Sequence, residues 1–236
     1  MDDKKRGCKV VVTKNGPYIV SGGLPLAKEI ILGDDEGNSV KWGKGEKYPE
    51  QETYALCRSG HSKNKPFCDG SHAKVGFDGT ETASLDKFEK QAEVIKGPAI
   101  DLLDVPQLCA SARFCHNKSG SVWELTRDSD NPESKKIAIQ QACNCPAGRL
   151  VILDKKTPIE PKFEPSLSIV EDAPANVSGP IWVKGGVPVE SHDGTRYETR
   201  NRVTLCRCGR SDNKPFCDST HVSIRFSDGD KRVMKR

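Results

Sequence analysis

The stretch CRCGRSDNKPFCDSTH, residues 206–221, occurs a second time in nearly the same form earlier in the chain. Residues 57–72 read CRSGHSKNKPFCDGSH, and 11 of the 16 aligned positions are identical. The later copy contains three cysteines and a histidine, whereas the earlier copy has Ser59 where the later one has Cys208. Cysteine thiolates and imidazole nitrogens are common ligands of zinc and iron. The repeat therefore predicts two metal sites with unequal sets of donors.

The duplication extends upstream of these cysteines. The segments GPYIVSGGLPL at 16–26 and GPIWVKGGVPV at 179–189 share their glycine, proline and apolar positions. Shared residues both near and far from the ligands indicate duplication of a whole structural unit. Short runs of β-forming residues between glycine and proline predict strands and hairpins, among them strands that deliver the first cysteine of each copy. The polar, glycine-rich residues 33–48, which lengthen the first copy, are predicted to form a surface loop.

The composition favours small modules held together by covalent or metal cross-links. The chain has 236 residues, of which 35% are hydrophobic, with 21 glycines and 15 prolines, which is too little apolar material for one large core. Its ten cysteines could form disulfides or bind metals. The charged N-terminal sequence MDDKKRGCKVVV lacks the apolar segment of a signal peptide. We therefore expect a reducing, cytoplasmic setting, where patterned cysteines are more often metal ligands than disulfides.

Two classes of partner are not expected. No apolar run approaches the roughly 18 residues that a membrane span requires. The net charge is only +4, and basic and acidic residues are interspersed instead of forming a basic stripe with aromatic residues. The sequence accordingly predicts no membrane and no nucleic-acid partner.

The spacing within the later copy suggests how its ligands converge. Cys217 and His221 are four residues apart, so a helix that starts near Asp218 would place both on one face. Cys206 and Cys208, two apart on an extended segment, can turn towards the same point. The C-x-C spacing is tighter than the C-x2–4-C spacing of structural zinc sites, and a two-iron cluster could take one pair of ligands per iron. Spacing alone favours iron–sulfur over zinc only slightly.

The whole pattern C-x-C-x2-S-x3-P-x-C-D-x2-H resembles the signature of the CDGSH iron–sulfur (NEET) family, and the letters CDGSH stand at residues 68–72. The later copy has all seven fixed positions, and the earlier copy lacks one. The resemblance implies a 2Fe–2S cluster with the C-x-C pair on one iron and the last cysteine and histidine on the other. In the later copy these residues are Cys206 and Cys208, then Cys217 and His221; in the earlier copy Cys57, Cys68 and His72 match, and Ser59 does not.

Ser59 leaves the fourth ligand of the first site open. A serine alkoxide is a harder and poorer ligand than a thiolate, and the hydroxyl resists deprotonation at neutral pH. Four alternatives follow: Ser59 binds, His61 replaces it, Cys8 or another thiol replaces it, or the site is empty or labile. We favour an occupied site with Ser59 or a nearby group as the fourth ligand. In the later copy, Ser219 and Thr220 replace the Gly-Ser of CDGSH but leave every ligand in place.

A different region separates the two copies. Residues 84–96 and 131–142 are predicted to be helical, the second with Asn131 as N-cap and Pro132 at the first helical position. The segment CNCPAGRL, residues 143–150, resembles the Cys-Pro end of bacterial ferredoxin ligand runs. This region contains four candidate ligands, Cys109, Cys115, Cys143 and Cys145.

The middle region as a whole, roughly residues 95–155, is similar to divergent ferredoxin-like modules found beside CDGSH motifs. Four thiolates are compatible with either a 2Fe–2S or a 4Fe–4S cluster, and a zinc site or unliganded buried thiols are the alternatives. The expected fold is a small, β-rich, irregular α+β protein. Two pseudo-symmetric CDGSH units, each with short strands and a ligand-bearing helix start, flank a small ferredoxin-like α/β domain. The expected boundaries are 1–92, 93–160 and 161–236, with a proline-rich linker at 155–166.

These features predict an iron–sulfur protein that acts in electron transfer with a redox partner. The alternatives are storage or transfer of clusters to an acceptor protein, and a zinc-stabilised interaction module. The tandem units could build a pseudo-dimer within one monomeric chain. No phosphate-binding loop, paired catalytic carboxylates or nucleophile–base context is present in the sequence, so we expect no enzyme.

Overall fold

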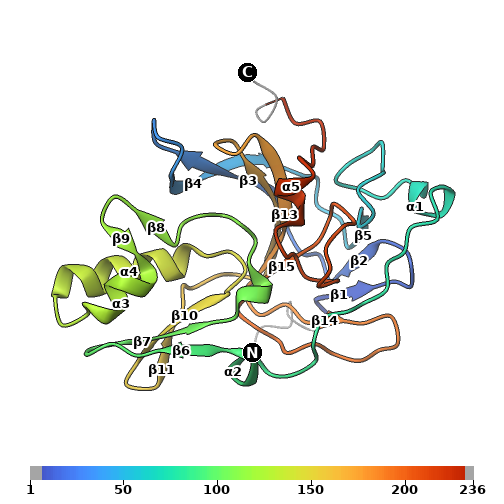
Figure 1. Ribbon diagram of the computed structural model, residues 1–236. Coiled ribbons are helices and arrows are strands. Elements are labelled where there is room, and N and C mark those ends of the chain that lie inside the picture. The colour runs from blue at the N-terminus through green and yellow to red at the C-terminus, as the bar shows by residue number, and fades with distance from the viewer. Residues whose placement is uncertain (1–6, 232–236) are drawn as a thin grey trace.

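The structure is a computed structural model that describes residues 7–231; the charged ends, residues 1–6 and 232–236, lie outside the described part. It contains mostly short strands with a few helices (Figure 1). The strands of the first copy are β1 (Lys9–Val12), β2 (Tyr18–Ser21), β3 (Leu26–Gly33), β4 (Ser39–Lys47) and β5 (Thr53–Leu56). Those of the second copy are β12 (Ser166–Asp172), β13 (Val177–Lys184), β14 (Val189–Glu190) and β15 (Arg202–Leu205). The strands predicted to deliver Cys57 and Cys206 are thus present.

The two copies exchange strands. One sheet has the order β14-β1-β2-β5 and the other β15-β13-β12-β3-β4. In the first sheet, three antiparallel strands of the first copy receive β14 in parallel, with Val189 paired with Val10. In the second, three antiparallel strands of the second copy receive β3 in parallel, with Leu26 paired with Leu167, and β4 follows on the outer side of β3. Figure 1 shows the consequence, in which blue strands of the first copy lie beside orange strands of the second. Neither copy completes its sheet alone.

The exchanged strands bury a common hydrophobic core. In β1 the side chains alternate between half-buried and buried, as expected for a strand with one face on the core. Every residue of β13 is buried, because this strand lies between β12 and β15 inside the larger sheet. One cluster of buried side chains joins both copies and includes Val20, Leu56, Ile181 and Leu205. The two copies are therefore packed as one body.

The middle region forms its own layer, green to yellow in Figure 1, beside the two sheets. Its sheet has the order β11-β10-β7-β6, with strands β6 (Glu93–Ile95), β7 (Asp101–Asp104), β10 (Leu150–Asp154) and β11 (Thr157–Ile159). Helices α3 (Val122–Arg127) and α4 (Pro132–Asn144) pack on it, and β8 (His116–Asn117) and β9 (Gly120–Ser121) form a hairpin. The N-cap predicted for α4 is confirmed, since Asn131 Oδ1 accepts a hydrogen bond from Glu133 N at 2.9 Å.

Two sequence-based predictions of local structure are wrong. Most of residues 33–48 form strand β4 (Ser39–Lys47), which pairs antiparallel with β3, and only residues 34–38 form a turn between the two strands. Its glycines are required by close packing, because a Cβ on Gly43 would lie 2.8 Å from the Leu32 side chain. Residues 84–96 hold only the one-turn helix α2 (Phe88–Gln91), which is followed by β6. Phe88 is the only buried residue of α2, so no apolar face sustains a longer helix.

Among the described helices, none combines the length and apolar character that crossing a bilayer would demand.

Candidate metal centres

The later motif is a loop that folds back on the strand that precedes it. β15 ends at Leu205, and Cys206 N then donates to Pro215 O at 2.8 Å, which pairs the two arms of the loop. Asp218 Oδ2 accepts from Asp212 N at 2.7 Å and fixes the far end. The same bonds recur in the earlier motif, where Cys57 N donates to Pro66 O at 2.8 Å. The shared serine, proline and aspartate positions of the two sequences thus build the same loop twice.

The four donors of the later motif come together in two pairs. Cys206 Sγ lies 3.6 Å from Cys208 Sγ, and Cys217 Sγ lies 3.4 Å from His221 Nδ1. All four residues are buried, each less than 9% exposed. Two sulfurs that share one tetrahedral ion at about 2.3 Å each would lie ~3.8 Å apart. Each pair therefore has the spacing of two ligands on one ion.

Within residues 7–231, no group of three or more histidine, cysteine or acidic side chains converges on a single metal-sized point. A single four-coordinate zinc ion would need such a point. The four donors of the later motif are instead arranged as two separate pairs.

The helix of the later motif starts later than the sequence predicted. α5 (Thr220–Ser223) begins after Ser219, which is its N-cap and has φ 74°. Asp218 precedes the N-cap, and its Oδ1 accepts from Thr220 N at 3.0 Å. Cys217 lies outside the helix altogether. Cys217 and His221 consequently face each other across the helix start and do not share a helical face.

Burial sets the protonation of the later donors. It lowers the pKa of His221 to about 4, so the imidazole is neutral and able to bind a metal at neutral pH. Burial also raises the pKa of the Cys217 thiol well above its usual value. The hydrogen bond between the two thiols of the C-x-C pair lowers the pKa of Cys206 to about 6. The same hydrogen bond raises the pKa of Cys208, so the two thiols ionise as a coupled pair in which Cys206 loses its proton first.

The arginine inside each C-x-C or C-x-S segment is buried but held differently. Arg207 forms ion pairs with Glu171 at 2.7 Å and Asp228 at 2.6 Å. Arg58 donates to the backbone oxygen of Thr13 at 3.1 Å and stacks over the Tyr18 ring, 5.6 Å from its centroid. The two loops thus share their path but have different electrostatic surroundings.

The earlier motif repeats the geometry with weaker enclosure. Cys57 Sγ lies 3.8 Å from Ser59 Oγ, and Cys68 Sγ lies 3.4 Å from His72 Nδ1. Ser59 is 4% exposed and occupies the position that corresponds to Cys208. Cys68 and His72 are only half-buried, unlike the corresponding residues of the later motif. The first site therefore has the same outline but a harder donor and a more open side.

The structure places Ser59, and not the alternatives, beside Cys57. His61 is exposed and contributes its backbone N–H, which donates to Ser59 Oγ at 3.3 Å. Cys8 lies in the first hairpin, where its Sγ donates to Gly22 O at 3.1 Å. Of the three named candidates, Ser59 is thus the group in position to complete the first pair.

The two motifs meet through glycines. A Cβ on Gly60 would lie 2.6 Å from Cys208 O, and a Cβ on Gly209 would collide in the same way with Ser59 O. Both glycines have φ 79°, a conformation that favours glycine. The contact is reciprocal, since each glycine approaches the residue that precedes the other one.

In the middle region, three of the four candidate cysteines come together. Cys109, Cys115 and Cys145 line one pocket, Cys109 directly after the short helix Pro106–Leu108. Burial, with further contributions from the neighbouring thiols of Cys145 and Cys109, raises the pKa of Cys115 to about 11. Cys143 does not line this pocket, and its Sγ lies 3.9 Å from Ile159 O. The structure thus separates Cys143 from the other three.

The pocket of the middle region adjoins the later motif. Ala110, Ala147 and Cys217 form one buried cluster, and Cys145 packs against it. The Cys109 thiol also contributes to the raised pKa of Cys217. Small side chains therefore form the wall between the two groups of thiols.

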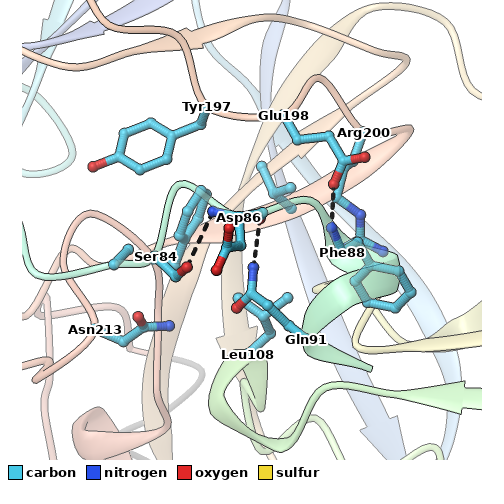
Figure 2. Close-up of a pocket in the computed structure, with 12 residues that line it drawn as sticks. Ser84, Asp86, Phe88, Gln91, Leu108, Tyr197, Glu198, Arg200 and Asn213 are labelled. Carbon is cyan, nitrogen blue, oxygen red and sulfur yellow. Dashed lines mark hydrogen bonds between the residues drawn. The ribbon is translucent and has the colours of Figure 1, made fainter. Parts of the chain in front are cut away.

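A second pocket lies near this junction and has no metal-binding character. Figure 2 shows that residues after the first copy, including Ser84, Asp86 and Phe88, face Tyr197 and Glu198 of the second copy. Phe88 N donates to Glu198 Oε2 at 2.6 Å, which ties the two segments together. Neither cysteine nor histidine lines this pocket, so it is separate from the candidate metal centres.

Comparison with known families agrees with the motifs. The family model described as "Iron-binding zinc finger CDGSH type" matches residues 15–73 and 178–222. The model described as "Divergent 4Fe-4S mono-cluster" matches residues 95–155 between them. No curated protein and no solved structure matches the chain. The motifs, the paired donors and both family matches together support iron–sulfur binding by a chain that has two CDGSH-type regions on either side of a divergent 4Fe–4S region.

Proposed function

We propose that the protein is an electron carrier, with one 2Fe–2S cluster on each CDGSH motif and a further cluster in the middle region. The observation that carries this proposal is the wall of Ala110 and Ala147 between Cys145 and Cys217. Bound clusters would supply one-electron chemistry. The chain contributes a short, packed and water-poor connection between the middle site and the later motif, in which small side chains keep the two groups of ligands close.

The ligand assignment follows from the pairs of donors. In the later motif Cys206 and Cys208 would bind one iron, and Cys217 and His221 the other. In the earlier motif Cys57 pairs with Ser59, and Cys68 pairs with His72. We assign Ser59 as the fourth ligand of the first site because its hydroxyl is buried beside Cys57.

The two CDGSH units are proposed to be related by an internal pseudo-two-fold axis, so that one chain builds a pseudo-dimer. The exchange of β3 and β14 and the reciprocal contacts of Gly60 and Gly209 support this relation. A single chain then needs no second copy to complete either site. We propose a monomer in the cytoplasm that works with a redox partner protein and is not itself an enzyme.

Cluster transfer is the second candidate, and the openness of the first site favours it. Cys68 and His72 are half-buried, and Ser59 is a poorer donor than the thiol of Cys208. A cluster there would be released more easily than one held by the four buried donors of the later motif. An acceptor protein could receive that cluster through the exposed side.

Anaerobically purified protein distinguishes these functions. The electron-carrier proposal expects a coloured protein that dithionite bleaches and a redox partner re-oxidises while iron and sulfide stay on the chain. EPR of the reduced protein should show broadening from magnetic interaction between the middle and later sites. Iron and sulfide that move to an apo-acceptor protein would instead support cluster transfer, and a colourless protein that contains zinc would overturn both.

A further inference from the structure

The middle region offers three thiols where a four-iron cluster bound entirely by cysteines would use four. Cys109, Cys115 and Cys145 line a common pocket, and each is partly exposed. Each iron of a four-iron cluster takes one ligand outside the cluster, so three thiols leave one corner without a protein sulfur.

The position of Cys143 explains why it is not the fourth ligand. Cys143 belongs to the last turn of α4, whereas Cys145 is the C-cap and has extended backbone, with φ −68° and ψ 112°. Residues two apart on a helix point in different directions, so the C-x-C spacing separates these thiols at a helix end.

The backbone of Cys143 is also held in place. The Arg202 side chain is 1% exposed and donates to Ala142 O at 3.0 Å and to Cys143 O at 2.6 Å. Ala142 O also accepts from Cys145 N at 3.1 Å, so Arg202 adds a second donor there and supplies one to Cys143 O in the last turn of α4. Moving the backbone so that Cys143 enters the pocket would break these hydrogen bonds to a buried charged group.

The one imidazole nearby does not supply the missing ligand. His116 Nδ1 lies 3.3 Å from Cys115 Sγ, which is the spacing of two donors on the same ion. His116 is exposed and does not line the pocket. It is therefore not placed to bind a different corner from the one that Cys115 would bind.

We propose that Cys109, Cys115 and Cys145 alone hold the middle cluster, and that its fourth corner carries a non-protein ligand, either water or a small thiol. This inference rests on the proposed presence of a cluster in the middle region. It assigns Cys143 a packing role at the end of α4. It also makes the fourth iron removable: a four-iron cluster in the 2+ state that gives one electron to ferricyanide and releases Fe2+ leaves a three-iron cluster in the 1+ state.

The test uses the full-length protein, anaerobically purified with its clusters. Oxidised 2Fe–2S clusters give no EPR signal, so ferricyanide-treated protein reports the middle site alone. We expect the signal of an oxidised three-iron cluster, the release of one Fe2+ per chain, and loss of the signal when Fe2+ and dithionite are added back. Cys143→Ser, Cys143→Ala and His116→Ala should keep this behaviour, whereas Cys115→Ser should abolish it.

Loss of the middle cluster in both Cys143 variants, with far-UV circular dichroism unchanged, would overturn the three-thiol assignment. Loss in His116→Ala would also overturn it, because the fourth ligand would then come from the protein. Failure of the wild-type protein to form a three-iron cluster under ferricyanide would count against a removable corner. In each case rapid electron exchange with a redox partner would leave the electron-carrier proposal standing, so the two failures are distinguishable.

Discussion

The hydroxyl of Tyr18, in the first copy, donates to the backbone oxygen of Cys206, in the later motif, at 2.8 Å. The same hydroxyl lies 3.0 Å from Pro215 O, on the opposite arm of that loop. Tyr18 is fully buried. A residue of one copy therefore clamps the ligand loop of the other, and the stability of the later site depends on the packing of both.

Tyr18→Phe should weaken the later site specifically. The variant leaves two buried carbonyl oxygens without this donor and should lower the free energy of unfolding by about 1–3 kcal/mol. Tyr54→Phe is the matched control, since the buried Tyr54 hydroxyl donates to Leu24 O at 2.8 Å, away from the later loop. Denaturant unfolding should show similar losses for both variants. The slow phase of iron release to a chelator, which reports the later site, should accelerate only for Tyr18→Phe. If the slow phase is equally fast in the Tyr18→Phe and Tyr54→Phe variants, Tyr18 does not stabilise the later loop.

The contact between the two motifs can be tested at its glycines. Gly209→Ala adds a methyl group that collides with Ser59 O, in a backbone conformation that alanine already disfavours. Gly186→Ala is the control, because Gly186 has φ 72° but nothing within 4 Å of the added Cβ. We expect a loss of about 1–2 kcal/mol for the control from backbone strain alone. Gly209→Ala should lose at least twice as much by denaturant unfolding. Equal losses would show that the loops do not press on each other in solution.

Much of the ligand chemistry could be predicted from the sequence because it is local. The spacing of Cys206, Cys208, Cys217 and His221 predicted that four donors converge, the resemblance to the CDGSH family implied their pairing, and Asn131 identified the start of α4. Strand exchange could not be predicted, because β3 and β14 pair with strands far away in the chain. The glycines of β4 appeared to belong to a loop, since the side chains of β3 that require them lie across the sheet.

In the middle site, too, contacts between residues far apart in the chain could not be predicted from the sequence. Four cysteines in one region suggested four ligands, but only the three-dimensional path separates Cys143 from Cys145 at the end of α4. The anchor that holds this helix end is Arg202, which belongs to β15 of the second copy. No local sequence signal links Arg202 to Cys143. Arg202 is the first residue of β15, four residues before Cys206, and this place in the sequence does not indicate that it contacts the middle region.

Exchanging serine and cysteine between the motifs tests whether Ser59 makes the first site fragile. Ser59→Cys places a thiol where the hydroxyl now lies, 3.8 Å from Cys57 Sγ, close to the 3.6 Å of the later pair. Iron at the first site should then resist a chelator better than in the wild-type protein, while the half-buried Cys68 and His72 still leave it more accessible than iron at the later site. Cys208→Ser is the reciprocal variant and should make iron at the later site more labile than in the wild-type protein. If Ser59→Cys leaves both the visible spectrum and iron release unchanged, Ser59 is not a ligand.

Glu171, which pairs with Arg207 behind the later motif, makes the stability of the folded protein depend on pH. Burial, with a further contribution from the nearby Asp228 carboxylate, raises the pKa of Glu171 from 4.5 to about 7, although Arg207 opposes the shift. Between these two values the folded protein holds a proton that the unfolded chain has released. The contribution of Glu171 to stability is therefore largest below pH 4.5 and is lost as the pH rises through 7, by at most about 1.4 kcal/mol per pH unit.

Glu171→Gln removes this dependence, because an amide does not titrate, and it keeps a side chain of the same shape beside Arg207. Denaturant midpoints measured from pH 5 to pH 8 should fall less steeply with pH for the variant than for the wild-type protein. Glu93→Gln, at an exposed position of β6, should follow the wild-type curve. If the denaturant midpoint falls equally with pH for Glu171→Gln and wild type, Glu171 is already ionised across this range. Arg207 would then lower the pKa of Glu171 by as much as burial raises it.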